Sequence, residues 1–236
     1  MPEHSPGPHP RPGALVLTAP TQEVLGTADP SVLTPDERRR HAALRHPADR
    51  NAFLASHLLV RRCAGAVTGR PAGTLEVVQV CAECGARGHG RPFVVGFPQV
   101  HVSLAHTRNV VVAGAGWGPL GVDVEDIGVQ APTLAAMPEL LAEAELSVVR
   151  SSPDVRLAFL RYWVRKECLV KIGVASLDAL QHTDLSDVID ETAGDGRTVG
   201  RYGPLHLVHW VDESLGAVVG VAGADVPVIR SLSDAT

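Results

Sequence analysis

NVVVAGAGWGPLGVDVE, residues 109–125, places two valine-rich runs on either side of a turn signal. The runs 109–115 and 120–125 have the composition of β-strands, and the Gly-Trp-Gly-Pro segment between them is typical of a turn. We therefore predict a β-hairpin here, preceded by a further strand over residues 100–104. Because the turn lies near the middle of the chain, we also predict a boundary between two lobes near residues 116–120.

Each side of this segment contains one long helix pattern. Residues 49–67 carry apolar side chains at positions 54, 58, 59 and 63, which is the spacing of one buried helical stripe. Residues 154–172 follow a helix-start signal at Ser152-Pro153-Asp154 and end before Gly173. Further strands are predicted over residues 74–80, 205–211 and 215–222, the last two as a hairpin.

The order of elements in each half is a helix followed by paired strands. This order predicts an α+β fold of two similar lobes, each with a long helix packed on a small, mainly antiparallel sheet. Residues 1–13, rich in proline, histidine and glycine, are predicted to form a disordered tail. The N-terminal lobe is predicted over residues 14–118 and the C-terminal lobe over residues 119–236.

The composition limits the classes of function. The chain has 236 residues, of which 45% are hydrophobic, and no apolar run approaches the roughly 18 residues of a membrane span. The net charge of −5 argues against nucleic-acid binding, because binding to phosphate backbones requires a large basic surplus. The scattered cysteines and the absence of a secretory signal predict a cytoplasmic protein without a disulfide framework.

The segment Gly121–Glu125 carries two carboxylates on one face of a strand. Since side chains alternate, Val122 and Val124 are expected in the core, with Asp123 and Glu125 together on the opposite face, about 6.6 Å apart. Oxygen-only ligands of this kind suit Mg²⁺. Taken alone, the pattern also fits an amphipathic strand with a solvated acidic face.

The second group lies on the helix 154–172. Trp163, Glu167 and Lys171 share one helical face, and Glu167 and Lys171 are i,i+4 neighbours. Such a pair is often only a surface stabiliser. However, Lys and Arg total 21 in this chain, and only Lys166 and Lys171 among them are lysines. Lysines in so arginine-rich a chain fit a site that needs a compact ammonium group, and taken alone they fit drift in composition equally well.

Basic and sulfur-containing groups precede these motifs. Thr34 begins a predicted helix with a capping box at Glu37, and the arginines 38–40 that follow also fit a solvated face. His106 follows a predicted strand, and alone it carries little weight. The glycine-rich segment 81–92 is predicted as a loop; its Cys81, Cys84 and His89 suggest zinc or redox chemistry, but without a second cysteine pair we favour structural thiols.

Together these residues resemble the Sfp-like 4'-phosphopantetheinyl transferases. The acidic signature G-[IV]-D-[IVL]-E corresponds to residues 121–125, and W-x-x-K-E-[AS]-x-x-K corresponds to residues 163–171, with Cys168 at the small-residue position. The resemblance extends upstream through the segments 104–107 and 90–92 and the helical stretch 34–61, and covers residues 30–222.

The resemblance implies a fold, an activity and a set of site residues. It implies a pseudo-dimer whose N-terminal lobe binds the nucleotide of coenzyme A and whose C-terminal lobe holds Mg²⁺ and the catalytic residues. The activity is transfer of 4'-phosphopantetheine from coenzyme A to a serine of an apo acyl or peptidyl carrier protein, in a monomer. The implied metal ligands are Asp123, Glu125 and Glu167; the implied catalytic residues are Glu167 (a general base), Lys171 and Asp123; and the implied coenzyme A contacts are Arg40, Arg91, Pro92, His106, Thr107 and Lys171.

Two positions depart from the family pattern: Ala105 stands where serine is frequent, and Glu37 where some members place a lysine. Two rival functions are a magnesium-dependent phosphoesterase and a catalytically idle module that binds coenzyme A or a carrier. The loop 128–142 is the expected contact with the acceptor, through its apolar residues Leu134, Met137, Leu140 and Leu141.

Overall fold

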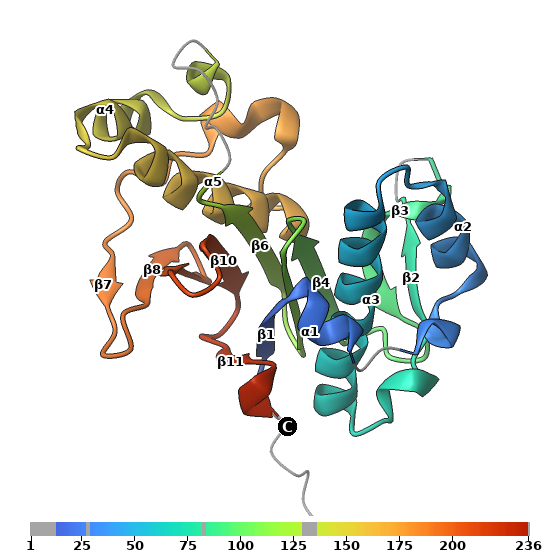
Figure 1. Cartoon of the computed structure of the whole chain (residues 1–236). Helices are drawn as coiled ribbons and strands as arrows, with labels where there is room; N and C mark the ends of the chain where they lie inside the picture. The colour runs from blue at the N-terminus through green and yellow to red at the C-terminus, as the bar shows by residue number, and fades with distance from the viewer. Residues whose placement is uncertain (1–12, 27–28, 82–83, 129–135, 236) are drawn as a thin grey trace, which may run out of the picture.

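The computed structural model describes residues 13–26, 29–81, 84–128 and 136–235. Two β-sheets lie in the middle of the molecule, and each is accompanied by one long helix (Figure 1). The predicted α+β class with two helix-on-sheet halves is confirmed. The predicted disordered tail lies, except for Gly13, outside the described residues.

The first sheet has six strands in the order β11-β1-β5-β4-β3-β2. Helix α3 packs against β5 and β4, and its apolar face forms a core with the sheet. The shorter helices α1 and α2 pack on α3. The bounds are β1 Leu15–Pro20, β2 Val77–Val80, β3 Arg87–Val94, β4 His101–His106, β5 Val110–Gly116, β11 Val228–Ser231, α1 Thr21–Leu25, α2 Pro35–Ala43 and α3 Pro47–Thr68.

The second sheet has five strands in the order β6-β10-β9-β8-β7. Helix α5 packs against β6, β10 and β9, and α4 packs on α5. The bounds are β6 Leu120–Asp126, β7 Glu191–Thr192, β8 Thr198–Tyr202, β9 Leu205–Asp212, β10 Ala217–Gly223, α4 Glu143–Ser151 and α5 Val155–Ile172. Short 3₁₀ helices occupy Pro30–Val32, Ala72–Thr74, Met137–Glu139, Leu177–His182 and Ser233–Ala235.

The predicted hairpin over residues 109–125 is wrong, although both of its strands exist. β5 pairs with β1 and β4 in the first sheet, whereas β6 pairs with β10 in the second. The turn at residues 116–119 therefore joins two sheets. The side chain of Ser103 on β4 contributes to this junction, because its Oγ accepts a hydrogen bond from the Val122 amide of β6 at 3.0 Å. The other predicted hairpin is confirmed as β9 and β10.

The segment predicted as a loop over residues 81–92 is partly a strand. β3 begins at Arg87 and pairs with β2, with a register shift between Gln79 and Val80. Its two glycines hid this strand, since glycine lowers β-propensity. Gly88 and Gly90 have positive φ values of 95° and 91°, which suit the irregular pairing.

The helix signals in the sequence are confirmed. The Thr34 side chain accepts from the Glu37 amide, and the Glu37 carboxylate accepts from the Thr34 amide, which completes the capping box of α2. Helices α3 and α5 end at Gly69 and Gly173, both in the left-handed conformation. These local signals fixed the two helices that support the sheets.

Helix α5 approaches β6 closely because Gly121 has no side chain. A Cβ atom at Gly121 would lie 2.3 Å from the Cys168 carbonyl oxygen of α5. Gly220 on β10 is a second such point, where a Cβ atom would lie 2.9 Å from the Val164 side chain. The close packing brings the two motifs of the second half together.

The strand β11 connects the end of the chain to the first sheet. It pairs in parallel with β1, from Leu15 opposite Val228 to Thr18 opposite Ser231. Leu232, which follows β11, is buried in the core beneath α3. The expected C-terminal lobe thus includes one strand of the other sheet, and the division at residue 118 stays a prediction.

No helix among the described residues is long and apolar enough to cross a membrane.

Candidate active site

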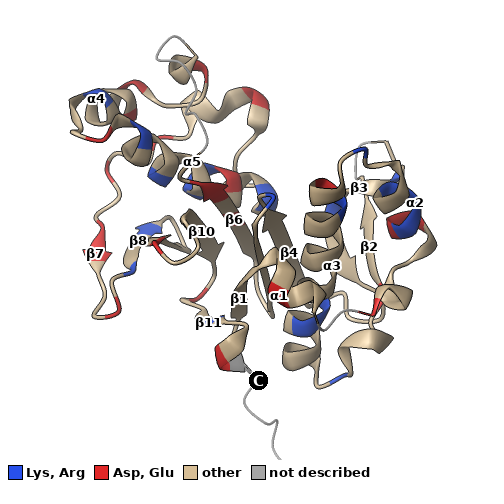
Figure 2. Cartoon of the chain, in the orientation of Figure 1, with Lys and Arg blue, Asp and Glu red and all other residues tan. Residues whose placement is uncertain are grey.

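A cleft of about 620 Å³ lies where the two halves meet. Charged segments of both signs lie on α2 and α5, on either side of β4 and β6 (Figure 2). The lining combines residues from both halves of the chain. Arg40, His106 and Thr107 come from the first half, and Asp123, Glu125 and Lys171 from the second.

Asp123 and Glu125 are held by different partners. Asp123 is only 6% exposed, and its Oδ1 accepts a hydrogen bond from the Lys171 ammonium at 2.7 Å. Its buried Oδ2 has no hydrogen-bond partner. Oε1 of Glu125 accepts from the indole N–H of Trp163 at 2.7 Å, and the Trp163 ring stacks on Phe159. The predicted alternation is confirmed, since Val122 and Val124 are buried in the core.

The three acidic side chains influence one another electrostatically. Burial and then the Asp123 charge raise the pKa of Glu125 above its ordinary value. The same two causes raise the pKa of Glu167, which lies on α5 one turn before Lys171. Burial lowers the pKa of Lys171, but the charge and hydrogen bond of Asp123, together with the nearby Cys168 and Glu167, outweigh this effect, and the pKa is raised. The carboxylates thus disfavour one another's charge in the absence of a cation.

The carboxylate groups of Asp123, Glu125 and Glu167 are suitable ligands for a divalent cation. A buried carboxylate oxygen without a partner is costly, and a cation would satisfy it. The carboxylates of Asp123, Glu125 and Glu167 are hard oxygen donors of the kind that Mg²⁺ prefers. Among the described residues, their oxygens are not gathered within 4.8 Å of one another. The pairing of Asp123 with Lys171 and of Glu125 with Trp163 accounts for this separation.

Arg40, predicted to bind coenzyme A, is directed into the cleft by its neighbours. Its guanidinium lies 5.1 Å from the centre of the Phe53 ring and donates a hydrogen bond to Gln79. Burial lowers the pKa of Arg40, with the Glu37 charge opposing it. It remains cationic at neutral pH, because arginine keeps its proton in proteins. Burial also lowers the pKa of His106, which leaves its imidazole neutral at pH 7.

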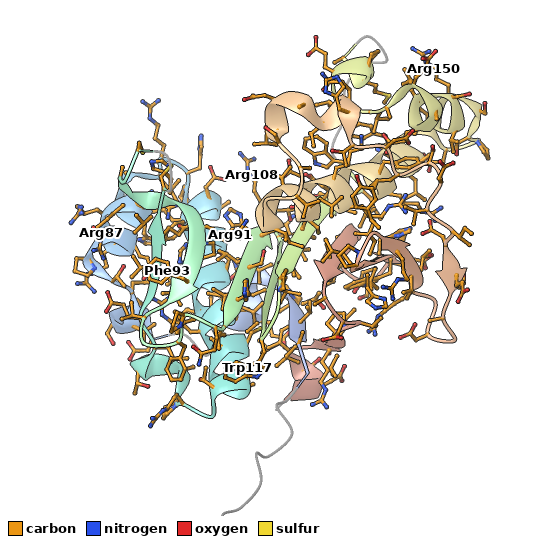
Figure 3. All side chains as sticks on the ribbon, turned by 180° about the vertical axis from the view of Figure 1, so that it is seen from behind. Arg87, Arg91, Phe93, Arg108, Trp117 and Arg150 are labelled. Carbon is orange, nitrogen blue, oxygen red and sulfur yellow. The ribbon has the colours of Figure 1, made fainter. Side chains whose placement is uncertain are left out.

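Arg91 and Pro92 line a neighbouring cleft of about 550 Å³. Lys171 lines both clefts, so the two predicted sets of residues adjoin at this ammonium group. Arg91 donates a hydrogen bond to the Ile172 carbonyl at the end of α5. Figure 3 shows Arg91 between the strands of the first half and α5, with Arg108 beyond it toward the same gap.

A buried ion cluster behind Arg40 was missed in the sequence. Glu37, 4% exposed, accepts hydrogen bonds from Arg61 Nη2 at 2.6 Å and from His57 Nδ1 at 2.6 Å. Burial raises the pKa of Glu37, but these hydrogen bonds outweigh it and hold the pKa at about 2. Glu37 therefore ties α2 to α3, and its departure from the family pattern has a structural reason. The i,i+3 spacing of Thr34 and Glu37 is visible in the sequence. The contacts of Glu37 with the distant Arg61 and His57 are not.

Lys166, the other lysine, faces away from the cleft. Its side chain and that of Glu145 are both 0% exposed, and their charged atoms lie 2.6 Å apart. Lys166 also donates to the Leu140 and Leu180 carbonyls at 3.1 and 2.8 Å. It fastens the segments before α4 and after α5 to the helix, and thus has a structural role.

The expected acceptor loop, residues 128–142, is only partly described, because 129–135, including Leu134, lie outside the described residues. Met137 and Leu141 are 1% and 2% exposed and belong to the core of the second half. The expectation that they face an acceptor is wrong, since their side chains fill the space beneath α4 and α5. Leu140 is partly buried against the same core.

The comparison with known proteins concerns mainly the second half of the chain. The family model of the 4'-phosphopantetheinyl transferase superfamily matches residues 119–223, which include both motifs. This part of the chain is similar to that superfamily, and the resemblance inferred from the motifs is confirmed at that level. The Sfp-like subgroup stays a prediction.

One curated relative extends the comparison. The 4'-phosphopantetheinyl transferase of Bacillus subtilis is 22% identical over 144 residues, which are 60% of this chain and 60% of that protein. The matched region therefore spans less than two thirds of the relative.

Proposed function

We propose that this protein transfers 4'-phosphopantetheine from coenzyme A to a serine of an apo acyl or peptidyl carrier protein, releases 3',5'-ADP, and requires Mg²⁺. The proposal depends on one observation: a single cleft joins the cationic Arg40 to the buried Asp123, whose Oδ2 lacks a partner. A substrate with phosphates at both ends of a nucleotide has the matching charge.

The nucleotide end of coenzyme A is assigned to the first-half wall. Arg40 would pair with the 3'-phosphate, because a guanidinium forms strong charge-assisted hydrogen bonds with phosphate. The neutral imidazole of His106 and the hydroxyl of Thr107 would contact the adenosine. Arg91 and Pro92, in the adjoining cleft, would border the same ligand.

The reacting end is assigned to the second-half wall. Mg²⁺ held by Asp123, Glu125 and Glu167 would neutralise charge on the pyrophosphate. Lys171 lines both clefts and would donate to an oxygen of the pyrophosphate, whose charge grows as the phosphorus–oxygen bond breaks. Glu167 would accept the proton of the carrier serine as its oxygen attacks the phosphorus atom that bears the pantetheine arm. Trp163 keeps Glu125 in place through its indole N–H.

The test is incubation of the purified protein with coenzyme A, Mg²⁺ and several apo carriers, followed by intact-mass measurement. We expect a gain of one phosphopantetheinyl group on the carrier, and no gain when the carrier serine is replaced by alanine. Release of 3',5'-ADP without any carrier would instead support the phosphoesterase. Coenzyme A binding without either product would support the idle module. The expected monomeric state and cytoplasmic location belong to the same proposal.

A further inference from the structure

A second cluster of side chains lies where β2 turns into β3, at the edge of the second cleft, which Cys81 lines. Each of three residues, Cys81, Cys84 and His89, offers one ligand atom, and these atoms all lie within 4.8 Å of one another. The Sγ atom of Cys84 is 3.3 Å from Nε2 of His89. Cys84 and His89 are exposed and Cys81 is half-buried, so the cluster is accessible from solvent.

The backbone around the cluster is built to bring these atoms together. The Cys81 carbonyl accepts from the Gly85 amide at 2.9 Å, and the Cys81 amide donates to the Ala86 carbonyl at 2.9 Å. Gly85 adopts a φ of 69°, which glycine accepts without strain. A tight turn thus follows the second cysteine and directs the chain back past the first.

Gly90 allows the returning strand to approach Cys81 closely. A Cβ atom at Gly90 would lie 2.8 Å from the Cys81 Cα and 2.6 Å from the Val80 carbonyl oxygen, too close for any other residue without a shift. His89 is thereby placed beside the cysteine pair. The sequence alone argued against a metal, since it shows no second cysteine pair, but this approach supplies a third ligand.

We propose that Cys81, Cys84 and His89 bind one Zn²⁺ ion, with a water molecule as the fourth ligand. Two thiolates and an imidazole are soft and borderline donors that suit zinc and disfavour Mg²⁺ or Ca²⁺. The two-residue spacing of the cysteines is that of structural zinc sites.

The ion would stabilise the turn that carries the next residues of β3. His89 directly precedes Gly90, whose carbonyl accepts from the Gln79 side chain at 3.0 Å, and Gln79 in turn accepts from Arg40. Arg91 follows Gly90. Zinc binding therefore stabilises the strand from which Arg91 reaches the neighbouring cleft.

The test is metal analysis of protein produced in zinc-supplemented medium and purified under reducing conditions without chelator. We expect about one zinc per chain, as for a structural site, and a lower thermal unfolding temperature after chelation. Cys84→Ser and His89→Ala should each lower zinc affinity by more than about 10-fold. Cobalt substitution should produce a thiolate-to-metal charge-transfer absorption in the wild type that Cys84→Ser lacks.

Two variants serve as controls: Cys63→Ala, from the core of the first half, and His182→Ala, from the surface of the second. Both should retain the metal, and circular dichroism verifies the fold of every variant. The proposal would be overturned by background zinc content after reconstitution, by a bound metal other than zinc, or by a Cys81–Cys84 disulfide in place of the metal. It would also be overturned if folded Cys84→Ser and His89→Ala both retained zinc in full. None of these outcomes depends on transferase activity.

Discussion

Asp123 has one oxygen bound to Lys171 and one buried oxygen without a partner. The ion pair offsets part of the free-energy cost of burying a carboxylate. The oxygen without a partner leaves the rest of this cost uncompensated. A buried carboxylate with such an oxygen in the lining of a cleft is a candidate functional group. This residue is therefore where the proposed function can be tested most directly.

Replacing either Asp123 or Glu167 by alanine should abolish transfer while the fold remains intact. The expected loss exceeds about 100-fold, because each variant removes a charge that would contact the cation or the attacking serine. Carrier mass measures activity and circular dichroism measures the fold. Asp187→Ala, an exposed aspartate in the same half, is the matched control and should transfer normally. Wild-type turnover by either variant would remove that residue from the site.

Arg40→Ala should lose the ability to distinguish coenzyme A from 3'-dephospho-coenzyme A. A charge-assisted hydrogen bond contributes about 1.5–3 kcal/mol, which corresponds to about 10- to 100-fold in KM. KM is measured for both substrates with both proteins, as in a double-mutant cycle. The wild type should prefer coenzyme A, and the variant should show no preference. Arg39→Ala is the control, since the Arg39 side chain is 74% exposed. Equal discrimination by Arg40→Ala and wild type would contradict the assignment.

The two lysines illustrate what could be inferred from residues alone. Their scarcity marked both as candidates for a site that needs an ammonium group, and for Lys171 this stays a prediction. Lys171 lines the cleft, whereas Lys166 is fully buried against Glu145. The acidic partner lies 21 positions earlier on another helix, and only the packing of α4 on α5 brings it near. Local spacing predicts which residues share a helical face, but not what that face contacts.

At the level of elements, the contact between α5 and β6 sets the geometry of the site. Glu167 and Lys171 lie on the helix, and Asp123 and Glu125 on the strand. Gly121 lets the two approach, because any side chain there would overlap the Cys168 carbonyl. The glycine of the acidic motif and the small residue of the helical motif thus face each other.

Gly121→Ala should separate the helix from the strand. We expect a loss of about 1–3 kcal/mol in the free energy of unfolding, typical of overpacking, together with a fall in transfer rate as Lys171 moves away from Asp123. Urea denaturation and the carrier assay measure the two effects. Gly194→Ala is the control, because a Cβ atom there meets nothing within 4 Å. Unchanged stability in Gly121→Ala would show that α5 moves freely against the sheet.

The contact between α2 and α3 should make stability depend on pH. The pKa of Glu37 is about 2 in the folded protein, below its ordinary value of 4.5. Its stabilising contribution is therefore complete above pH 4.5 and is lost as the pH falls from 4.5 toward 2.

Glu37→Gln should cost about 3–5 kcal/mol at pH 7, since it leaves Arg61 buried without its counter-charge. The difference from wild type should shrink as the pH falls below 4.5, as followed by urea denaturation across that range. Glu76→Gln, an exposed glutamate in the same half, should behave like wild type. A difference that does not vary with pH would show that the Glu37 charge is not stabilising.

The elements that could be predicted are those with local signals. Helices α3 and α5 end at glycines, and their ranges were predicted to within two residues. The start of α2 was predicted from its capping box. The partner of β5 could not be predicted, because the turn after it resembles that of a hairpin. Its actual neighbours are set by β1 and β4, and local residues do not encode which strand of a sheet lies adjacent.

For the whole molecule, the expected division into two halves describes the two sheets except at the end of the chain. β11 crosses from the second half to the first and pairs in parallel with β1. A parallel pair requires a long connection, here most of the chain, and no local pattern announces it. The C-terminal segment is therefore part of the first core.

Leu232→Ala should destabilise the protein although only four residues follow it in the sequence. Leu232 is 4% exposed and packs in the core of the first half, and removing a buried leucine costs about 2–5 kcal/mol. The denaturation midpoint measures the effect. Leu177→Ala, at a position 56% exposed, is the control and should change stability little. If Leu232→Ala behaves like Leu177→Ala, the end of the chain is not docked in solution.

The crossing of β11 also bears on how the protein could be divided for experiments. A fragment that ends at the junction of the two sheets would leave the outer side of β1 with unsatisfied amide and carbonyl groups. Such an open edge recruits strands from other copies and promotes aggregation. Separate production of the two pieces would then succeed only if the C-terminal piece is supplied in trans to complete the sheet.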